Sequence, residues 1–443
     1  MFNSEGGIFV KKKTFFALFS ALVMILSLAF PFFVLSYEDI PNENVYNCSS
    51  VEGEYKNNYS YYEYCNIQLI CKYYGDFFNY ENMNRHLCIM YYNDSHLFYT
   101  YIQRIEALFM SLEWREMYIE ERLVAIALTE EEIVAMSTET LIRATIENPI
   151  MTYLFLFNSF QQGFERIFYV NPGLRELTKR TDFFDAFISE YMVVAMNLSD
   201  YALRCSADIR PRGAWSLSVM EIVMAQPEMH QHITSEQAAN MVDIFFKVRA
   251  NEVEKHTFPY VFLSAVSEIE YSTIFDRYIS MQITPFNFLV QIRTPRGSIV
   301  LVENRRQMPE MCYSEMWTII SDVRRLHPNA VILRNPTRRW NCHSFSLHDR
   351  SGSGYWLNGH AHFTNNHPSS MTPFFTDGSL RHAGTSPGPF DIIEWFQSDH
   401  TGVVISTSNQ GIWVESKWGF GPLVRHLAHD SPYSGGIQFW RWN

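Results

Sequence analysis

The spacing of apolar residues predicts a helical middle part of the chain, from about residue 99 to 284. Ile102, Ile105, Leu108 and Phe109 lie three or four positions apart, which places all four on one face of a helix. The same spacing recurs further along this part of the chain. We therefore expect an all-α domain of short antiparallel helices packed on one another.

Three features give these helices starting points and a centre. Thr129 is followed by three acidic residues, and Thr234 by a serine, a glutamate and a glutamine. A hydroxyl residue ahead of acidic or amide side chains is typical of a helix N-terminus. Residues 215–227 are almost continuously apolar, which predicts a central buried helix.

The pattern changes to strands after Pro285. Two short runs rich in β-branched residues, 286–292 and 298–302, flank a Pro-Gly turn, which predicts a β-hairpin. A helix is expected from about residue 310 to 326. We treat residues 285–334 as a connecting segment between two domains.

Residues 335–443 have the composition of a separate small domain. Strand-like runs alternate with loops rich in glycine, serine and proline, and this stretch holds seven of the ten tryptophans and nine of the fifteen histidines. We therefore expect candidate catalytic residues in this stretch.

The N-terminal residues predict that the protein is exported from the cytoplasm. Lys11, Lys12 and Lys13 precede an uncharged apolar run over residues 14–35, after which the chain turns polar. We expect residues 1–36 to be a cleaved secretory signal, with an uncleaved membrane anchor as the alternative because the run is long enough to span a bilayer. The protein is then extracellular or held at the cell surface, and it meets the membrane only through this segment.

The number and clustering of the cysteines fit an oxidising compartment outside the cytoplasm. The Tyr- and Asn-rich residues 37–98 read as a small disulfide-containing module, although four cysteines allow three pairings. Cys205 and Cys312 could pair with each other or stay buried. The odd total leaves at least one free thiol, which we expect to be Cys342. The clustered cysteines are Cys48, Cys65, Cys71 and Cys88.

Composition excludes two broad classes of protein. With 443 residues, 47% hydrophobic and 16% aromatic, the chain is too apolar to be disordered. Its formal net charge of -12 argues against binding nucleic acid through overall charge. No cofactor motif is present.

Candidate chemistry lies in three short segments of the last domain. Cys342 stands at the expected start of a helix, His400 at the start of a strand, and Glu415 on the following strand. This is the order that a papain-like hydrolase needs: a thiol nucleophile, an imidazole base and a third group that orients the ring. Glu415 is our choice for the orienting role, with His343, Ser416 and His426 as possible supporting residues. Which face of the Glu415 strand lines the site stays open.

These segments resemble a known group of proteins. WNCHSFSL at 340–347, HTGVVIS at 400–406 and ESKWG at 415–419, together with upstream segments, resemble secreted bacterial proteins whose C-terminal domain is papain-like, similar to NlpC-type peptidases and CHAP amidases. The resemblance covers roughly residues 170–443. It departs from the expected cysteine motif at Trp340, Phe345 and Ser346.

The resemblance implies an α+β fold, in which a papain-like domain at 335–443 follows the disulfide-containing module and the helical domain in the sequence. It implies a catalytic pair at Cys342 and His400, and it matches Glu415 to the carboxylate of CHAP domains. The expected activity is hydrolysis of an amide or peptide bond, with a bacterial cell-wall peptide as the candidate substrate. A peptide or peptidoglycan-like molecule would be the substrate, with no cofactor, no metal and no nucleic acid.

Two other functions stay open. The papain-like domain could be catalytically silent in a secreted binding or scaffold protein. A zinc-dependent hydrolase is the weaker alternative, because His360 and His362 could form a two-residue clip but no established zinc motif accompanies them.

The predicted cleavage of the signal can be tested by sequencing the N-terminus of the mature protein. Cleavage should leave a chain that begins close to Tyr37, because the small residues that a signal peptidase needs lie just before it. A mature protein that begins at Met1 would contradict cleavage and support the anchor.

Overall fold

The computed structural model describes residues 96–204, 213–231, 233–250, 288–308, 310–352, 354–359 and 369–443. All of them belong to one compact unit that begins at Asn66. The expected signal or anchor segment, the clustered cysteines and Cys205 lie outside the described residues. Among the helices that are described, none combines the length and apolarity needed to cross a bilayer.

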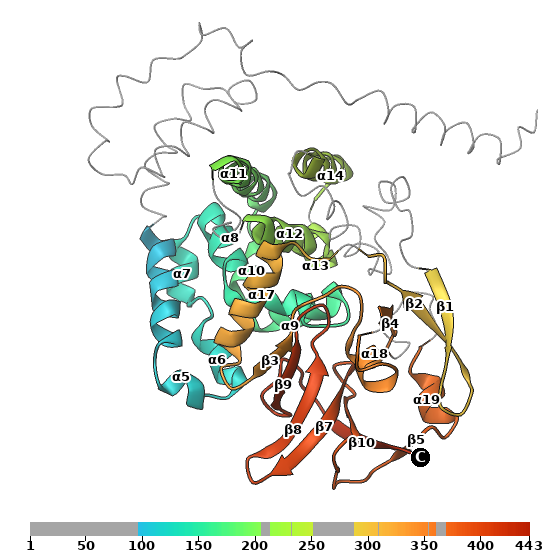
Figure 1. The fold of residues 1–443 in the computed structure, drawn as a ribbon. Helices are drawn as coiled ribbons and strands as arrows, with labels where there is room; N and C mark the ends of the chain where they lie inside the picture. Colours follow the sequence, from blue (N-terminus) through green and yellow to red (C-terminus); the bar gives the residue numbers. More distant parts are fainter. Residues whose placement is uncertain are drawn as a thin grey trace, which may run out of the picture. The chain divides into compact units, whose positions relative to one another are not determined.

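The N-terminal half of this unit is helical (Figure 1). A helical stretch over residues 96–109 leads into a series of mostly short helices. These are α5 (Glu113–Glu116), α6 (Ile119–Ala125), α7 (Glu130–Ala135), α8 (Thr138–Ile146), the 3-10 helix η3 (Pro149–Phe155), α9 (Phe160–Val170), α10 (Pro172–Leu177), α11 (Phe183–Arg204), α12 (Gly213–Ala225), α13 (Pro227–His230) and α14 (Ser235–Ala250).

The predicted helix starts and the predicted central helix are confirmed. Thr129 accepts a hydrogen bond from the backbone N–H of Glu132, whose carboxylate accepts one in return. Thr234 and Gln237 make the same reciprocal pair at the start of α14. Such capping boxes satisfy N–H groups that have no partner within the helix. In α12, every residue from Trp215 onward is buried.

The predicted hairpin is also confirmed. β1 (Phe288–Arg293) pairs antiparallel with β2 (Ile299–Asn304), and β4 (Tyr355–Trp356) adds to β2 to make a three-stranded sheet. Gly297 in the turn has φ +92, a conformation that glycine adopts without the penalty of a side chain. The helix expected after the hairpin is α17 (Tyr313–Leu326).

The second sheet has seven strands and is antiparallel in all its pairings. Two short helices, α18 (Cys342–Leu347) and α19 (Thr372–Thr376), lie between its strands in the sequence. In spatial order the strands are β3 (Val331–Arg334), β9 (Leu423–Leu427), β8 (Gly411–Lys417), β7 (His400–Ser408), β6 (Ile392–Trp395), β10 (Ile437–Trp442) and β5 (Leu380–His382).

Each face of this sheet packs against a different part of the protein. Ile393 and Val404 point into a core shared with the helical half, whereas their neighbours Ile392 and Val403 point into a second core with α18 and the small sheet. The alternation follows from the two-residue period of a strand. The chain is therefore an α+β protein, as predicted, and its helices and large sheet share one continuous core.

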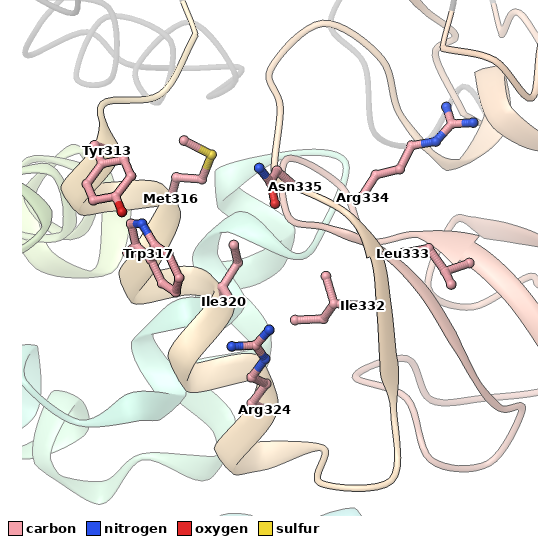
Figure 2. Close-up of a pocket in the computed structure, with 9 residues that line it drawn as sticks. All are labelled: Tyr313, Met316, Trp317, Ile320, Arg324, Ile332, Leu333, Arg334 and Asn335. Carbon is pink, nitrogen blue, oxygen red and sulfur yellow. The ribbon is translucent and has the colours of Figure 1, made fainter.

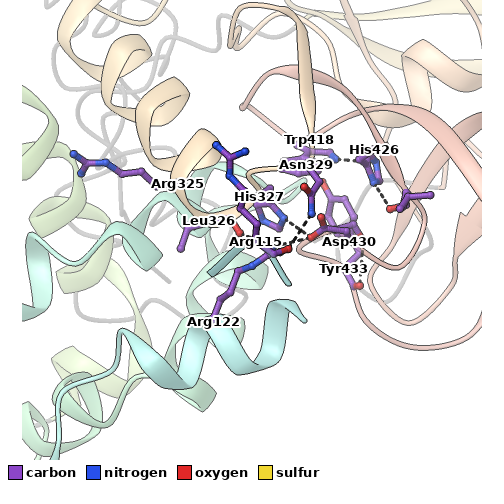
Figure 3. Close-up of polar contacts among 12 residues, drawn as sticks. Arg115, Arg122, Arg325, Leu326, His327, Asn329, Trp418, His426, Asp430 and Tyr433 are labelled. Carbon is purple, nitrogen blue, oxygen red and sulfur yellow. Dashed lines mark hydrogen bonds and ion pairs between the residues drawn. The ribbon is translucent and has the colours of Figure 1, made fainter. Parts of the chain in front are cut away.

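A buried ion pair joins the helical half to the sheet (Figure 3). Arg122 of α6 donates to Asp430, 3.1 Å away, and to the backbone oxygen of Leu326 at the end of α17. His327 lies 3.5 Å from the same carboxylate. Burial opposes ionisation of Asp430, but hydrogen bonding and the charges of His327 and Arg122 prevail and lower its pKa to about 2.

A close backbone contact joins the helical half to the turn that follows β8. Gly419 has φ +48, and a side chain there would overlap the backbone carbonyl of Phe157, which follows η3. Gly421 donates a backbone hydrogen bond to Phe155 at 2.9 Å. The turn after β8 therefore requires glycine both for its conformation and for the space it leaves.

We predict that Gly419→Ala lowers the free energy of unfolding by about 2–4 kcal/mol, because strain and overlap act together. Gly297→Ala is the matched control, since Gly297 also has positive φ but faces open space, and it should cost about 1 kcal/mol. Urea denaturation of both variants measures the difference. Equal losses would show that the contact with Phe157 is unimportant.

Candidate functional site

Cys342 is the first residue of α18, as the sequence predicted for the start of a helix. The side chain of Asn341 caps this helix by accepting a hydrogen bond from the N–H of Ser344 at 3.1 Å. Cys342 carries a free thiol and has no exposed surface. Because α18 packs against β7 and β8, its first turn faces the ends of the central strands.

A side chain from the helical half reaches the thiol. Asn158, in the short link between η3 and α9, accepts a hydrogen bond from Sγ of Cys342 at 3.3 Å. Its Oδ1 also accepts from Asn341 at 3.3 Å, while its Nδ2 donates to the backbone oxygen of Asp399 at 2.6 Å. The same Nδ2 lies 3.0 Å from Nε2 of His343. One amide thus touches every part of the site.

The imidazole of His343 lies between a hydroxyl and a carboxylate. Nδ1 is 2.9 Å from the hydroxyl oxygen of Thr401, and Nε2 is 3.6 Å from Oδ1 of Asp399. Burial opposes protonation, yet the charges of Cys342 and Asp399, and hydrogen bonds to both, raise the pKa of His343 to about 10. Asp399 is the acceptor for a proton on Nε2, whereas the amide nitrogen of Asn158 can only donate to this atom when it is unprotonated. The structure therefore groups a thiol, an imidazole and a carboxylate.

Asp399 is held in an unusual backbone conformation. Its φ is +47, in the left-handed region that non-glycine residues seldom adopt, and its side chain is almost fully buried. A side chain at Gly359 would overlap the Asp399 carboxylate, so that glycine makes room for it. Strained residues of this kind persist where the surroundings determine the conformation.

His400 faces away from α18. Its ring stacks on Tyr433 at 3.5 Å between centroids and lies 5.2 Å from Trp395, in the core shared with the helices. Burial, and after it the positive charge of His343, lower its pKa well below the usual value. Its neighbour Thr401 is the residue that reaches His343, because consecutive strand residues point to opposite faces.

The structure does not bring Glu415 to His400. The carboxylate of Glu415 accepts from Arg425 at 2.6 Å and 3.0 Å, and both side chains are partly exposed. This is the ion pair expected when a strand residue lies on the solvated side of a sheet. Asp399, one position before His400, carries the carboxylate nearest to an imidazole of the site.

Ser416 and His426 lie together in the core rather than at the thiol. The Ser416 hydroxyl is 2.8 Å from Nε2 of His426 and accepts from the indole N–H of Trp418 at 3.0 Å. Nδ1 of His426 faces the backbone oxygen of Leu427 at 2.8 Å, so this nitrogen carries the proton of a neutral ring. Burial lowers the pKa of His426 to about 4.

Lys417, the last residue of β8, has a fully buried side chain. Its Nζ donates to the backbone oxygens of Gly419 at 2.6 Å and Thr337 at 3.3 Å. Burial lowers its pKa to about 7, against the opposing charges of Cys342 and Glu310. A lysine poised to lose its proton near neutral pH thus lies within the electrostatic reach of the thiol.

Sequence reasoning missed Asn158 and Lys417 and gave Asp399 no role. Asp399 had a usable signal, because it lies next to His400 in a polar turn. Asn158 had none, since 184 positions separate it from Cys342. For the zinc alternative, His360 and His362 lie outside the described residues, and the described part holds no group of three His, Cys, Asp or Glu able to bind a metal ion.

Comparisons with known proteins give no relative. Neither family models, nor curated proteins, nor solved structures contain a match to this chain.

Removal of the carboxylate should change how His343 titrates. We predict that Asp399→Asn lowers the pKa of His343 from about 10, because one of the two charges that favour the imidazolium is lost. NMR titration of the ring protons measures this, with His348, which has no contact with Asp399, as an internal control. A pKa of His343 that stays near 10 in the variant would assign the shift to Cys342 alone.

The same ionisation links His343 to stability. Its folded pKa lies above the ordinary value of about 6.5, so the stabilisation is complete below pH 6.5 and disappears as pH rises through 10. Asp399→Asn should flatten this fall in the free energy of unfolding between these two pH values.

Proposed function

We propose that this chain is a secreted cysteine hydrolase that cleaves an amide or peptide bond through a papain-like C-terminal domain. The observation that carries the proposal is the buried contact set of Cys342, His343 and Asp399. A thiolate is the nucleophilic form of cysteine, and a neighbouring imidazolium stabilises it. An antiparallel sheet with the cysteine helix packed on its central strands supports the papain-like architecture.

In this proposal the reaction follows the order of contacts at the site. The Cys342 thiolate attacks the carbonyl carbon, and the imidazolium of His343 gives its proton to the leaving amine. Water then enters, His343 takes its proton, and the acyl–sulfur bond breaks to regenerate the thiolate. Asp399 stabilises the charged ring throughout. Backbone N–H groups near Cys342 and His343 would stabilise the oxyanion.

His343 replaces His400 as our first choice of base. It has the carboxylate and the hydroxyl that orient a catalytic ring, whereas His400 is neutral and stacked on Tyr433. His400 stays the second choice because Nε2 is buried and has no hydrogen-bond partner among the described residues. The proposed substrate class is unchanged: a peptide outside the cytoplasm, such as that of the bacterial cell wall.

One observation favours a catalytically silent binding protein instead. Cys342, His343 and Asp399 are all at most 2% exposed, and a substrate carbonyl must touch the sulfur. In that case the thiol, amide and imidazole would serve as a buried polar network that orders the core.

Alkylation of Cys342 by iodoacetamide, followed across pH, tests the proposal. We expect labelling at about pH 6 to depend on His343, because a protonated imidazole beside the sulfur favours the nucleophilic thiolate form. His343→Ala should slow labelling at this pH at least about tenfold, while His400→Ala should leave it within about twofold, and Cys342→Ala identifies background labelling.

Three results would contradict parts of this assignment. Slowing by His400→Ala alone would return the role of base to His400. Labelling that begins only at about pH 8–9, or that never occurs in the native protein, would favour the silent binding protein. Peptide hydrolysis that survives Cys342→Ala would end the nucleophile assignment.

A further inference from the structure

A groove of about 250 Å³ lies between α17 and the edge strand β3, apart from the Cys342 site (Figure 2). Trp317 and Ile320 line its α17 side, and Ile332 lines its β3 side. The chain turns back from α17 into β3, so helix and strand run alongside each other. The groove is lined from the β3 side by Ile332, Leu333 and Arg334.

The α17 wall presents aromatic rings to solvent. Tyr313 is 48% exposed and Trp317 is 46% exposed, and their rings meet edge to face at 5.7 Å. Aromatic side chains offer large contact areas at little cost in conformational entropy, and for this reason they are enriched in binding sites.

The β3 wall is an unpaired sheet edge. β3 is the last strand of the seven-stranded sheet, with β9 as its one strand partner among the described residues. Val331 is 51% exposed and Leu333 is 37% exposed on this short strand. Natural proteins usually protect an exposed apolar edge, because its N–H and C=O groups accept another strand.

One arginine gives the groove a positive charge, although the chain as a whole is acidic. The side chain of Arg324 in α17 has no hydrogen bond or ion pair within the described part of the chain, whereas its neighbour Arg325 pairs with Glu106 at 3.1 Å. Arg334, at the end of β3, donates to the backbone oxygen of Ser351. Its guanidinium lies 5.8 Å from the centroid of the Trp340 ring, and its side chain points away from α17 (Figure 2). The formal net charge of the chain is -12, so the free positive charge of Arg324 is a local exception.

We infer that the groove binds an extended, acidic peptide segment of a partner protein, which adds as a strand to the free edge of β3. The edge supplies backbone hydrogen bonds, the Trp317–Ile320–Ile332 surface takes alternate apolar side chains, and Arg324 pairs with a carboxylate. A glycan could stack on the aromatic rings, but it has no backbone to continue the sheet. The assignment is independent of the chemistry of Cys342.

A synthetic peptide tests this directly. The probe has seven residues in which glutamate alternates with valine and tyrosine, and binding to the full-length protein is followed by fluorescence anisotropy. Arg324→Glu and Trp317→Ala should each weaken binding at least about tenfold, since arginine and tryptophan contribute most at interfaces. The affinity should also fall as salt is added.

Matched variants and probes make the test specific. Arg296→Glu changes the same charge at an exposed site in the β1–β2 turn, and Tyr169→Ala removes an aromatic ring that is 79% exposed on α9; both should bind as the wild type does. A probe with lysine in place of glutamate should not bind, and one with prolines should fail because it lacks backbone donors.

Equal binding by the acidic and basic probes, or by Arg324→Glu and wild type, would overturn the inference. So would undiminished binding of the proline probe, which excludes strand addition. A wild-type protein that forms a dimer disrupted by Leu333→Glu would assign the edge to a second copy of this chain and overturn it as well.

Discussion

The geometry of the site depends on how closely two segments of backbone approach each other. The turn after β8 can lie against the carbonyl of Phe157 because Gly419 has no side chain. That contact fixes the link between η3 and α9, and Asn158 is the next residue along this link. The amide that touches Cys342, His343 and Asp399 is therefore positioned by a turn more than 250 residues further along the chain. The helical half is part of the site, not a spacer in front of it.

Buried polar groups hold the same interface from the other side. Arg122, His327 and Asp430 lie where α6, the end of α17 and the loop after β9 meet. Removing one member of such a pair leaves an uncompensated buried charge, which generally costs several kcal/mol. The interface therefore tolerates little rearrangement, and this rigidity suits a site in which the contacts of one amide must be satisfied at once.

The sequence was informative wherever the signal is local. Capping residues such as Thr129, the apolar run of α12 and the Pro-Gly hairpin before β2 each depend on neighbours within a few positions. The position of Cys342 at a helix start followed from the same kind of local pattern, whereas the α+β class was implied by the resemblance to papain-like domains. The contacts of the site do not follow from such patterns. Asn158 reaches the thiol through tertiary packing, and whether Glu415 faces the site or solvent depends on which side of β8 is covered.

The start of β7 shows how much depends on a single position. His400 and Thr401 are neighbours in the sequence, yet one stacks on Tyr433 and the other contacts His343 across the sheet. Only residues 396–399 separate β6 from β7. Gain or loss of one residue there would exchange the two faces, because side chains alternate along a strand. A sequence with identical strands but a turn of different length would thus present an imidazole where this chain presents a hydroxyl. In this fold, the length of a turn determines the chemical groups around the cysteine as much as the residues of the strand do.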